Sequence, residues 1–253
     1  MIHKFSLSLC LLTGAIWAGS SIPAVLAQST LPPATQQIPA ATTLTQPVYS
    51  NAVLTVQDLP PGFKELPPEV TAQVQTQFEL LSSQLAKAGM KPEKFFAFIN
   101  PDTLQMVVGF TSLISNQPDQ GNFDVILKQM QQPEYQQQMM NQIRESIKSN
   151  QGIKIVDYGM IPSVNNNIGE TASGMTVGID LQGQILQLDL ASFRRSNVGA
   201  FTAIIYRKGD RPTVNLDAVA RQLDTRIVQT ATGAIPASNN ESEVTPPNTR
   251  EIQ

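Results

Sequence analysis

The sequence has one histidine, one cysteine and one tryptophan in 253 residues. All three lie near the N-terminus, as His3, Cys10 and Trp17. The rest of the chain therefore has no imidazole and no thiol. That excludes Ser-His-Asp and Cys-His catalysis, thiolate zinc sites, disulfides and haem ligation by His or Cys. We expect a non-enzymatic protein with no cofactor and no metal site.

Residues 1–27 have the features of an export signal. Lys4 supplies a short positive region, and residues 5–19 form an apolar stretch shorter than the ~20 residues of a membrane span. Val25-Leu26-Ala27 is typical of a cleavage site, so we expect cleavage after the alanine, with an uncleaved anchor as the alternative. Leu9 precedes Cys10 where a lipidation motif requires Gly or Ala, so lipidation is not expected.

The charge balance is mildly acidic. There are 17 basic and 20 acidic residues, a net charge of −3, which loss of Lys4 with the signal would change to −4. Nucleic-acid binding needs a basic face that neutralises phosphates. We therefore expect no nucleic-acid partner, and no transmembrane segment after the signal.

Two stretches of low complexity flank the centre of the chain. Residues 28–52 carry no charge and are rich in Pro, Thr, Gln and Ala, so they are expected to form a flexible linker. Residues 231–253 have a similar composition and are expected to form a disordered tail. Residues 53–230 lie between them and are numerous enough for a single domain with a packed core.

Hydrophobic spacing and turn residues predict the elements of this domain. Helices are expected over residues 69–88, 122–148 and 215–228, with Asn122 as the cap of the second and Pro133 as a break within it. Strands or hairpins are expected over 53–56, 95–114, 153–158, 170–181, 184–193 and 198–207.

The stretch from Val198 to Tyr206 is mainly apolar at both alternating sets of positions. A strand that is apolar on both faces lies centrally in a sheet, with a layer on each side. Runs of consecutive strands favour antiparallel pairing. We therefore predict an α+β fold, in which helices cover both faces of an antiparallel sheet as an α/β/α sandwich.

Basic residues gather at both ends of this strand. Arg194 and Arg195 precede it, and Arg207, Lys208 and Arg211 follow it. At ~3.3 Å per strand residue, Arg195 and Arg207 are roughly 40 Å apart, too far for one anionic ligand to bridge. The preferred interpretation is that these are strand ends lying in water. The alternative is a docking contact for an acidic partner, and these five residues are the candidates for it.

Two further patterns are weak matches to a phosphate-binding loop and to a catalytic pair of carboxylates. Residues 169–176, "GETASGMT", match the spacing of a phosphate-binding loop, but Met175 stands at the lysine position and a strand is expected there. Asp180 and Asp189 flank a predicted hairpin turn, and paired carboxylates can perform acid–base catalysis if held close. Asp189 alternates with leucines, so it is expected to point away from their face.

Two segments carry a resemblance. "LTVQDLPPGFKELP" and "LDLASFRRSNVGAFTAIIYRKGDRPTVNLDAVARQLDTRI" resemble a family of exported cyanobacterial proteins. The order of elements also resembles that of PsbP-like proteins, which have an antiparallel sheet between helical layers. The resemblance implies a periplasmic or thylakoid-lumenal protein without catalysis, often an accessory to photosystem II or its assembly. Metal sites of PsbP involve histidine, so no PsbP site residue transfers to this chain.

We therefore expect an exported, non-enzymatic binding or accessory protein whose partner is a membrane-associated protein complex. One alternative is a periplasmic envelope protein that binds an apolar ligand between sheet and helices. A less favoured alternative is a hydrolase that works without His or Cys. Fold alone does not decide between these functions.

Overall fold

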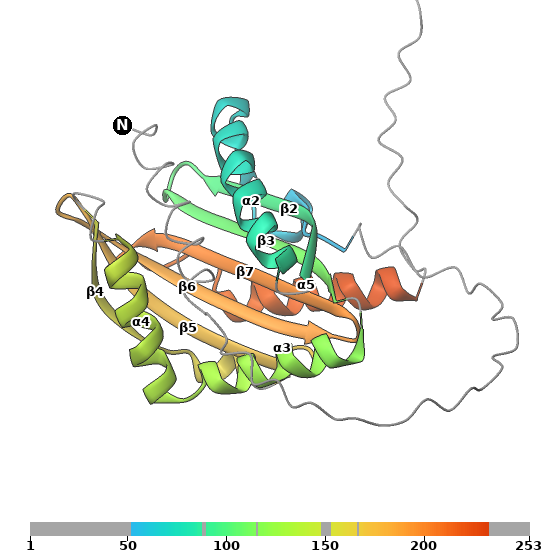
Figure 1. The fold of residues 1–253 in the computed structure, drawn as a ribbon. Helices are drawn as coiled ribbons and strands as arrows, with labels where there is room; N and C mark the ends of the chain where they lie inside the picture. The colour runs from blue at the N-terminus through green and yellow to red at the C-terminus, as the bar shows by residue number, and fades with distance from the viewer. Residues whose placement is uncertain (1–51, 88–89, 115, 148–152, 166, 233–253) are drawn as a thin grey trace, which may run out of the picture.

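The computed structural model describes residues 52–87, 90–114, 116–147, 153–165 and 167–232 (Figure 1). The expected signal over 1–27 lies outside the described residues. So do the expected linker, apart from Ala52, and the expected tail, apart from Ala231 and Thr232.

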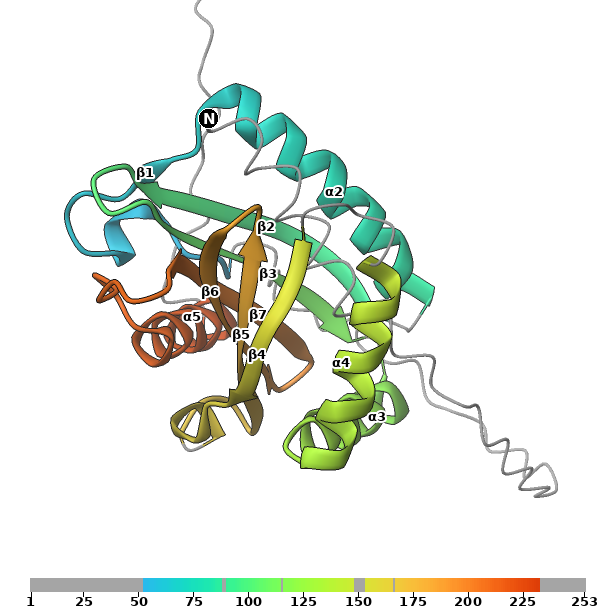
Figure 2. The ribbon, with the colours of Figure 1, turned by 90° about the vertical axis from the view of Figure 1, so that its left-hand side faces the viewer.

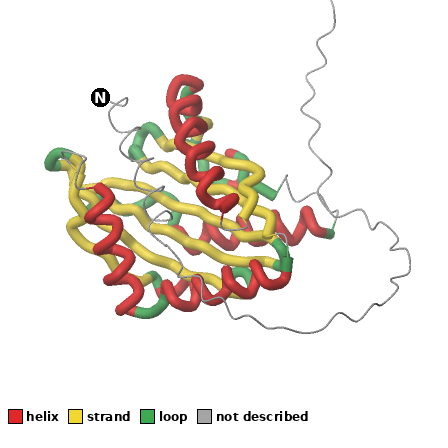
Figure 3. Tube along the Cα trace, viewed as in Figure 1, coloured by secondary structure: helices red, strands yellow, loops and turns green. Residues whose placement is uncertain are grey.

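The described residues form one seven-stranded sheet, helices and short 3-10 turns (Figure 3). The strands are β1 (Lys64–Glu65), β2 (Met90–Asn100), β3 (Gln105–Ile114), β4 (Ile153–Met160), β5 (Thr171–Leu181), β6 (Gln184–Arg195) and β7 (Val198–Arg207). Their order is β1-β2-β3-β7-β6-β5-β4, and every neighbouring pair is antiparallel. The helices are α2 (Pro68–Lys87), α3 (Gln117–Met130), α4 (Pro133–Ile147) and α5 (Leu216–Ala231), and the 3-10 turns are η2 (Val56–Asp58) and η3 (Pro162–Asn165).

Strand β7 occupies the centre of the sheet, which confirms the sequence interpretation. Its first eight residues are all buried. Phe201 and Ile205 belong to one apolar cluster, and Ala200 and Ile204 belong to the cluster on the opposite face. The alternating pattern of a strand divides its side chains in this way.

Helices α2, α3 and α4 pack on one face of the sheet (Figures 1 and 2). Aromatic rings join them to the central strands. Phe110 of β3 stacks on Phe201 of β7 with ring centroids 4.5 Å apart, and Phe123 of α3 meets Phe201 edge-on at 5.7 Å. Phe78 of α2 lies 5.5 Å from Phe110. Each such pair adds about 0.5–1.5 kcal/mol beyond its buried area.

The predicted α/β/α sandwich is wrong, because three of the four α-helices in the described residues, α2, α3 and α4, gather on one side of the sheet. Among the residues that the structure describes, the opposite face has a single α-helix and no comparable helical layer. Helix α5 lies there along β6 and β7, and irregular chain supplies the rest of the apolar cover. That cover includes Leu54, Leu59 and Phe63 before the first helix and Val164 of η3.

The physical reason for this error lies in what an apolar strand requires. Side chains on both faces of β7 must be removed from water, but any apolar surface can do this. The prediction assumed that the cover would be helical. Here Leu54 is 2% exposed without belonging to any helix or strand, so irregular chain is enough.

Two local predictions also differ from the structure. The expected strand over 53–56 is absent, because Thr55 and Asp58 form a capping box around η2. The second helical region begins earlier than Asn122, because Asn116 is the cap and its side chain accepts from the Asp119 N–H at 2.9 Å. Pro133 does divide this region, and α4 begins there.

The two outer strands of the sheet differ in length. At one edge β1 has two residues, and at the other β4 has eight. The register of β4 shifts at Val156, because Ile155 pairs with Ile179 whereas Asp157 pairs with Gly178. The extra residue is a bulge, and the Val156 side chain is 44% exposed.

Gly109 of β3 is a position where no side chain fits. A Cβ there would lie 2.4 Å from the Phe201 carbonyl oxygen and 2.4 Å from Cζ of Phe96. Gly109→Ala should therefore lower the free energy of unfolding by about 1–3 kcal/mol through overpacking. Gly121 is the matched control, since it lies inside α3 and a Cβ there meets nothing within 4 Å. Gly121→Ala should raise stability by up to about 1 kcal/mol. Urea denaturation of both variants measures the difference, and equal effects would contradict the packing assigned to β3.

Candidate functional site

Arg194 occupies the end of β6 and is enclosed by carboxylates. Its Nε and Nη2 donate to Oδ1 and Oδ2 of Asp124 in α3 at 2.7 and 2.6 Å. Its Nη1 donates to Glu170 Oε2 at 2.6 Å and to the Ser196 carbonyl oxygen at 2.8 Å. The side chain is 12% exposed. The hydrogen bonds from Arg194 lower the pKa of Asp124, although its burial opposes them.

Arg195 makes an equivalent fork with a different helix. Its Nε and Nη2 donate to Oδ1 and Oδ2 of Asp224 in α5 at 2.8 and 2.5 Å. The Gly169 N–H also donates to Asp224 Oδ2, at 3.1 Å. Hydrogen bonding to Asp224, opposed by burial, raises the pKa of Arg195. Arg194, Arg195, Asp124, Glu170 and Asp224 are called the arginine cluster below.

The interpretation of these arginines as strand ends in water is wrong for Arg194, which is largely buried, and incomplete for Arg195, which is 31% exposed. The Nε and Nη2 donors of both arginines are used within the chain. The phosphate-loop spacing of residues 169–176 also has a local explanation. The Gly169 N–H binds a carboxylate of α5, and the segment from Thr171 onward is strand β5. The prediction that Arg194 and Arg195 dock a partner stays a prediction.

The other three candidate cations lie at the opposite end of the β6–β7 hairpin. Arg207 pairs with Leu186, whereas Arg195 pairs with Val198 beside the turn. The Lys208 ammonium forms an ion pair with Asp157 of β4. Arg207 and Arg211 are exposed, and no ion pair of theirs occurs within the described part of the chain.

A polar patch lies on the sheet beside Lys208. The residues opposite one another across β5, β6 and β7 are Thr176 with Asp189, and Gln187 with Tyr206. Cross-strand partners share a face of the sheet. Leu188 belongs to the cluster beneath α3 and α4, so its neighbours in β6 face the other way. Asp157, Thr176, Gln187, Asp189 and Tyr206 form what is called the polar sheet face below.

Hydrogen bonds connect the centre of this face. The Tyr206 hydroxyl donates to Asp189 Oδ2 at 2.9 Å, and the Thr176 hydroxyl donates to Asp189 Oδ1. The Gln187 amide nitrogen donates in turn to the Thr176 hydroxyl. Burial, together with the charge of Asp189 and the hydrogen bond to it, raises the pKa of Tyr206. The phenol therefore stays protonated and remains a donor at neutral pH.

The polar sheet face is on the side of the sheet opposite α2, α3 and α4. Helix α5 contacts β6 and β7 through apolar side chains, and η3 packs against β5. Beyond them the face stays partly exposed. Ile185, in the same row of β6, is 38% exposed, and the side chains of Asp157 and Lys208 are 44% and 42% exposed.

The remaining sequence candidates do not form a site with these residues. Asp180 accepts from the Gly183 N–H at 2.6 Å and so fixes the β5–β6 turn, whereas Asp189 binds Thr176 and Tyr206. Within the described ranges, no group of three or more His, Cys, Asp or Glu residues is placed to hold a metal ion.

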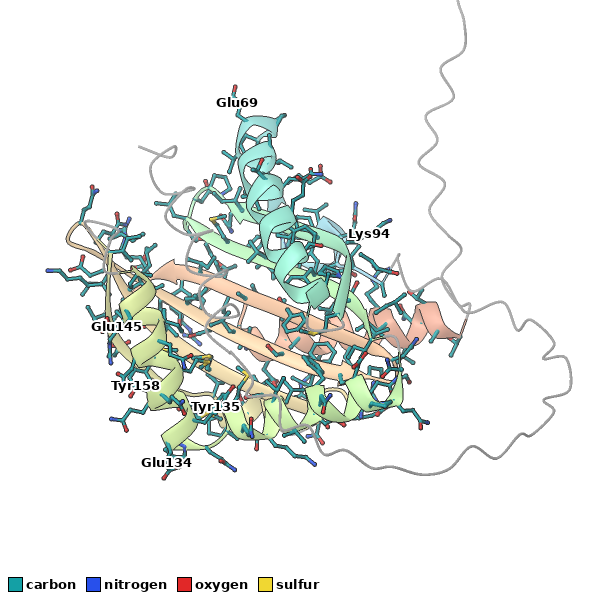
Figure 4. The ribbon with its side chains drawn as sticks, in the orientation of Figure 1. Glu69, Lys94, Glu134, Tyr135, Glu145 and Tyr158 are labelled. Atoms are coloured by element: carbon teal, nitrogen blue, oxygen red, sulfur yellow. The ribbon has the colours of Figure 1, made fainter. Side chains whose placement is uncertain are left out.

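A shallow hollow of about 410 Å³ follows the outer surface of α4. Its described lining consists of Glu134, Gln137, Gln138, Asn141, Gln142 and Glu145. Figure 4 shows the two glutamates near opposite ends of the helix. Ligand sites are usually concave and largely apolar. The described lining of this hollow comes from one polar face of α4, so we interpret the hollow as ordinary helix surface and not as a ligand site.

A further buried carboxylate attaches the N-terminal segment to α5. The side chain of Asp58 is 4% exposed and accepts from Arg226 Nη2 at 2.5 Å, Gln222 Nε2 at 3.0 Å and the Thr55 N–H at 2.8 Å. Burial alone would raise the pKa of Asp58, but the hydrogen bonds from Arg226, Thr55 and Gln222 outweigh it and lower the pKa. The cover that α5 and the N-terminal segment give to the sheet depends on this contact.

Comparison with known proteins adds no family to these observations. No protein-family model matches the chain, and no curated protein matches it. Within the ranges that the structure describes, no helix is both long enough and apolar enough to span a membrane. The structure defines the class of protein as a domain with a seven-stranded antiparallel sheet, three helices gathered on one side of it and α5 on the other.

Arg194→Ala should lower the free energy of unfolding by about 1–3 kcal/mol, because it leaves Asp124 and Glu170 without their partner in a partly buried site. Arg221 is the matched control, since it forms an exposed pair with Asp217 one turn away in α5. Arg221→Ala should change stability far less, as exposed pairs contribute little. Chemical denaturation of the two variants decides this. A change for Arg194→Ala no larger than that for Arg221→Ala would overturn the structural role of the arginine cluster.

Asp58→Asn should lower the free energy of unfolding by about 2 kcal/mol at pH 7, where the charged contact with Arg226 is fully present. Because the folded pKa of Asp58 is lowered, the wild type keeps this contribution above the ordinary aspartate pKa of about 4 and loses it as pH falls through the folded value. The difference between the two proteins should therefore shrink in acid. Denaturation curves at pH 7, 4 and 3 measure it, and a difference that stays constant would contradict the assignment.

Proposed function

We propose that this chain is an exported, non-enzymatic binding or accessory protein, and that the polar sheet face is its docking surface. The observation that carries the proposal is the arrangement of Asp189, Tyr206 and Thr176 on a partly exposed part of the sheet. Hydrogen-bonding side chains held in fixed positions by one another, on rigid strands, favour specific recognition.

The contacts of this face favour binding over catalysis. Acid–base catalysis by two carboxylates needs both groups near the reacting bond. Here Asp189 accepts from two hydroxyls, while Asp157 is paired with Lys208. Both carboxylates are thus engaged in contacts that stabilise the sheet. The sequence after Trp17 also has no His or Cys to act as base or nucleophile.

The partner that we propose is a membrane-associated protein complex outside the cytoplasm, in the periplasm or the thylakoid lumen. The loop with Arg207, Lys208 and Arg211 borders the polar sheet face, so acidic side chains of the partner can contact its rim. The more specific proposal of a photosystem accessory role rests on the sequence resemblance alone.

The docking proposal can be tested with a photo-crosslinking residue at two exposed positions. Ile185 lies in the polar sheet face row and is 38% exposed, whereas Val125 is 52% exposed on α3, across the sheet. Introduced in the native cell, the probe at position 185 should crosslink to one discrete protein, and the probe at 125 should not. Crosslinks from position 125 alone, or from neither position, would rule out docking through this face.

A further inference from the structure

Strand β4 ends the sheet on the side away from β1, and its outer edge is open. It pairs with β5 along its length, and within the described ranges no strand pairs with its other side. Alternate residues of such an edge direct a backbone N–H and a C=O outward. The binding partner that matches a row of these groups is the backbone of an extended polypeptide segment.

The helical side of β4 carries an apolar row that is incompletely covered. The residues of β5 that pair with this row are at most 8% exposed. The members of the row itself all remain partly exposed: Ile153, Ile155, Tyr158 and Met160. The first three pack against the apolar cluster beneath α4, and Met160 contacts Gln136 of that helix. Side chains of an added strand would lie beside this row and remove it from water, so apolar residues at every second position favour binding.

The bulge at Val156 limits the length of the segment that fits this edge. Beyond the bulge, the register with β5 is regular from Asp157 to Met160. Val156 and Asp157 both lie beside Gly178, so two consecutive residues occupy the polar sheet face and the alternation of β4 is interrupted there. A segment of about four residues can pair with the regular part without crossing the interruption.

The geometry points to an extended segment of the partner protein, bound along the β4 edge from Asp157 to Met160. Its backbone continues the sheet, and its apolar side chains, at alternate positions, lie on the side of α4 beside Tyr158 and Met160. Asp157 belongs to the polar sheet face, so a partner docked there lies next to this edge. This inference rests on the proposed function and names how the partner is held.

The probe is the peptide acetyl-Thr-Val-Thr-Val-Thr-amide, and its control is the same peptide with every backbone nitrogen methylated. Both are titrated into the intact, ¹⁵N-labelled chain. At about ten times its Kd, the first peptide should slow hydrogen exchange about ten-fold at those amides of Tyr158, Gly159 and Met160 that β5 does not bind. The methylated peptide cannot donate and should have no effect. Ala203 of β7 has a strand on either side and should not change. Equal effects of the two peptides, or no effect of either, would overturn the inference.

A third peptide and two variants test the apolar row. Acetyl-Thr-Ser-Thr-Ser-Thr-amide keeps the backbone donors and should bind about five-fold more weakly than the valine peptide, because its side chains bury less apolar surface. Tyr158→Ser should weaken the valine peptide similarly. Lys154→Ala changes the other side of β4, before the bulge, and should leave affinity unchanged. Equal affinities of the serine and valine peptides would overturn the stated chemistry, and the peptides on the wild-type chain decide this even if Tyr158→Ser fails to fold.

Exchange measured without peptide tests for a different occupant. The outward amides of β4 should exchange freely in the chain alone, at low and at high protein concentration. Protection that is already present there would overturn the inference, since the chain itself or a second copy would then cover the edge.

The outcome is separable from that of the proposed function. A crosslink from Ile185 with no effect of the valine peptide would keep the docking surface and overturn the pairing at β4. Protection by the valine peptide without any crosslink from Ile185 would keep the peptide site at β4 and remove the polar sheet face as the docking surface. Neither experiment uses the result of the other.

Discussion

Consecutive residues of a β-strand point to opposite faces of the sheet. Because Arg194 and Arg195 are consecutive in β6, they connect this strand to helices on both faces. Arg194 reaches α3 on one face, and Arg195 reaches α5 on the other. Both forks start from the same end of β6, beside the turn into the central strand. The elements that cover the two faces are thus held at one point, and Glu170 adds the start of β5 through the Ser196 N–H at 2.9 Å.

The unequal cover of the two faces explains where a functional surface could arise. One face is closed by three helices around Phe110 and Phe201. On the other, α5 and the N-terminal segment form an apolar layer that ends before it reaches β4. The strand positions beyond that limit are Thr, Gln, Asp and Tyr instead of Val, Ile or Leu. Polar side chains at these positions form hydrogen bonds with one another. This part of the sheet can therefore be exposed to solvent without presenting an apolar patch.

The sequence predicts the strands and the central place of β7 well, because these follow from local periodicity. It predicts the surroundings of charged residues poorly, since their partners are distant in the chain: Asp124 lies 70 positions from Arg194. One signal was present. Asp224 lies beside Leu223 on the apolar side of α5 and is 8% exposed, and a carboxylate on a buried helix face requires a cationic partner. No comparable signal marks Thr176 or Gln187, whose contacts exist only through the strand register.

The bulge in the edge strand β4 affects whether two copies of the chain can associate through their sheet edges at high concentration. A long outer strand presents free backbone donors and acceptors, to which a second sheet can add. At the opposite edge β1 is too short to offer many. In β4 the bulge at Val156 interrupts the spacing of these groups, and Lys154 places a charge next to it. A second β4 cannot pair along the whole length of a strand whose hydrogen-bonding register shifts in the middle. The bulge in β4 therefore opposes edge-to-edge pairing of two sheets through this strand.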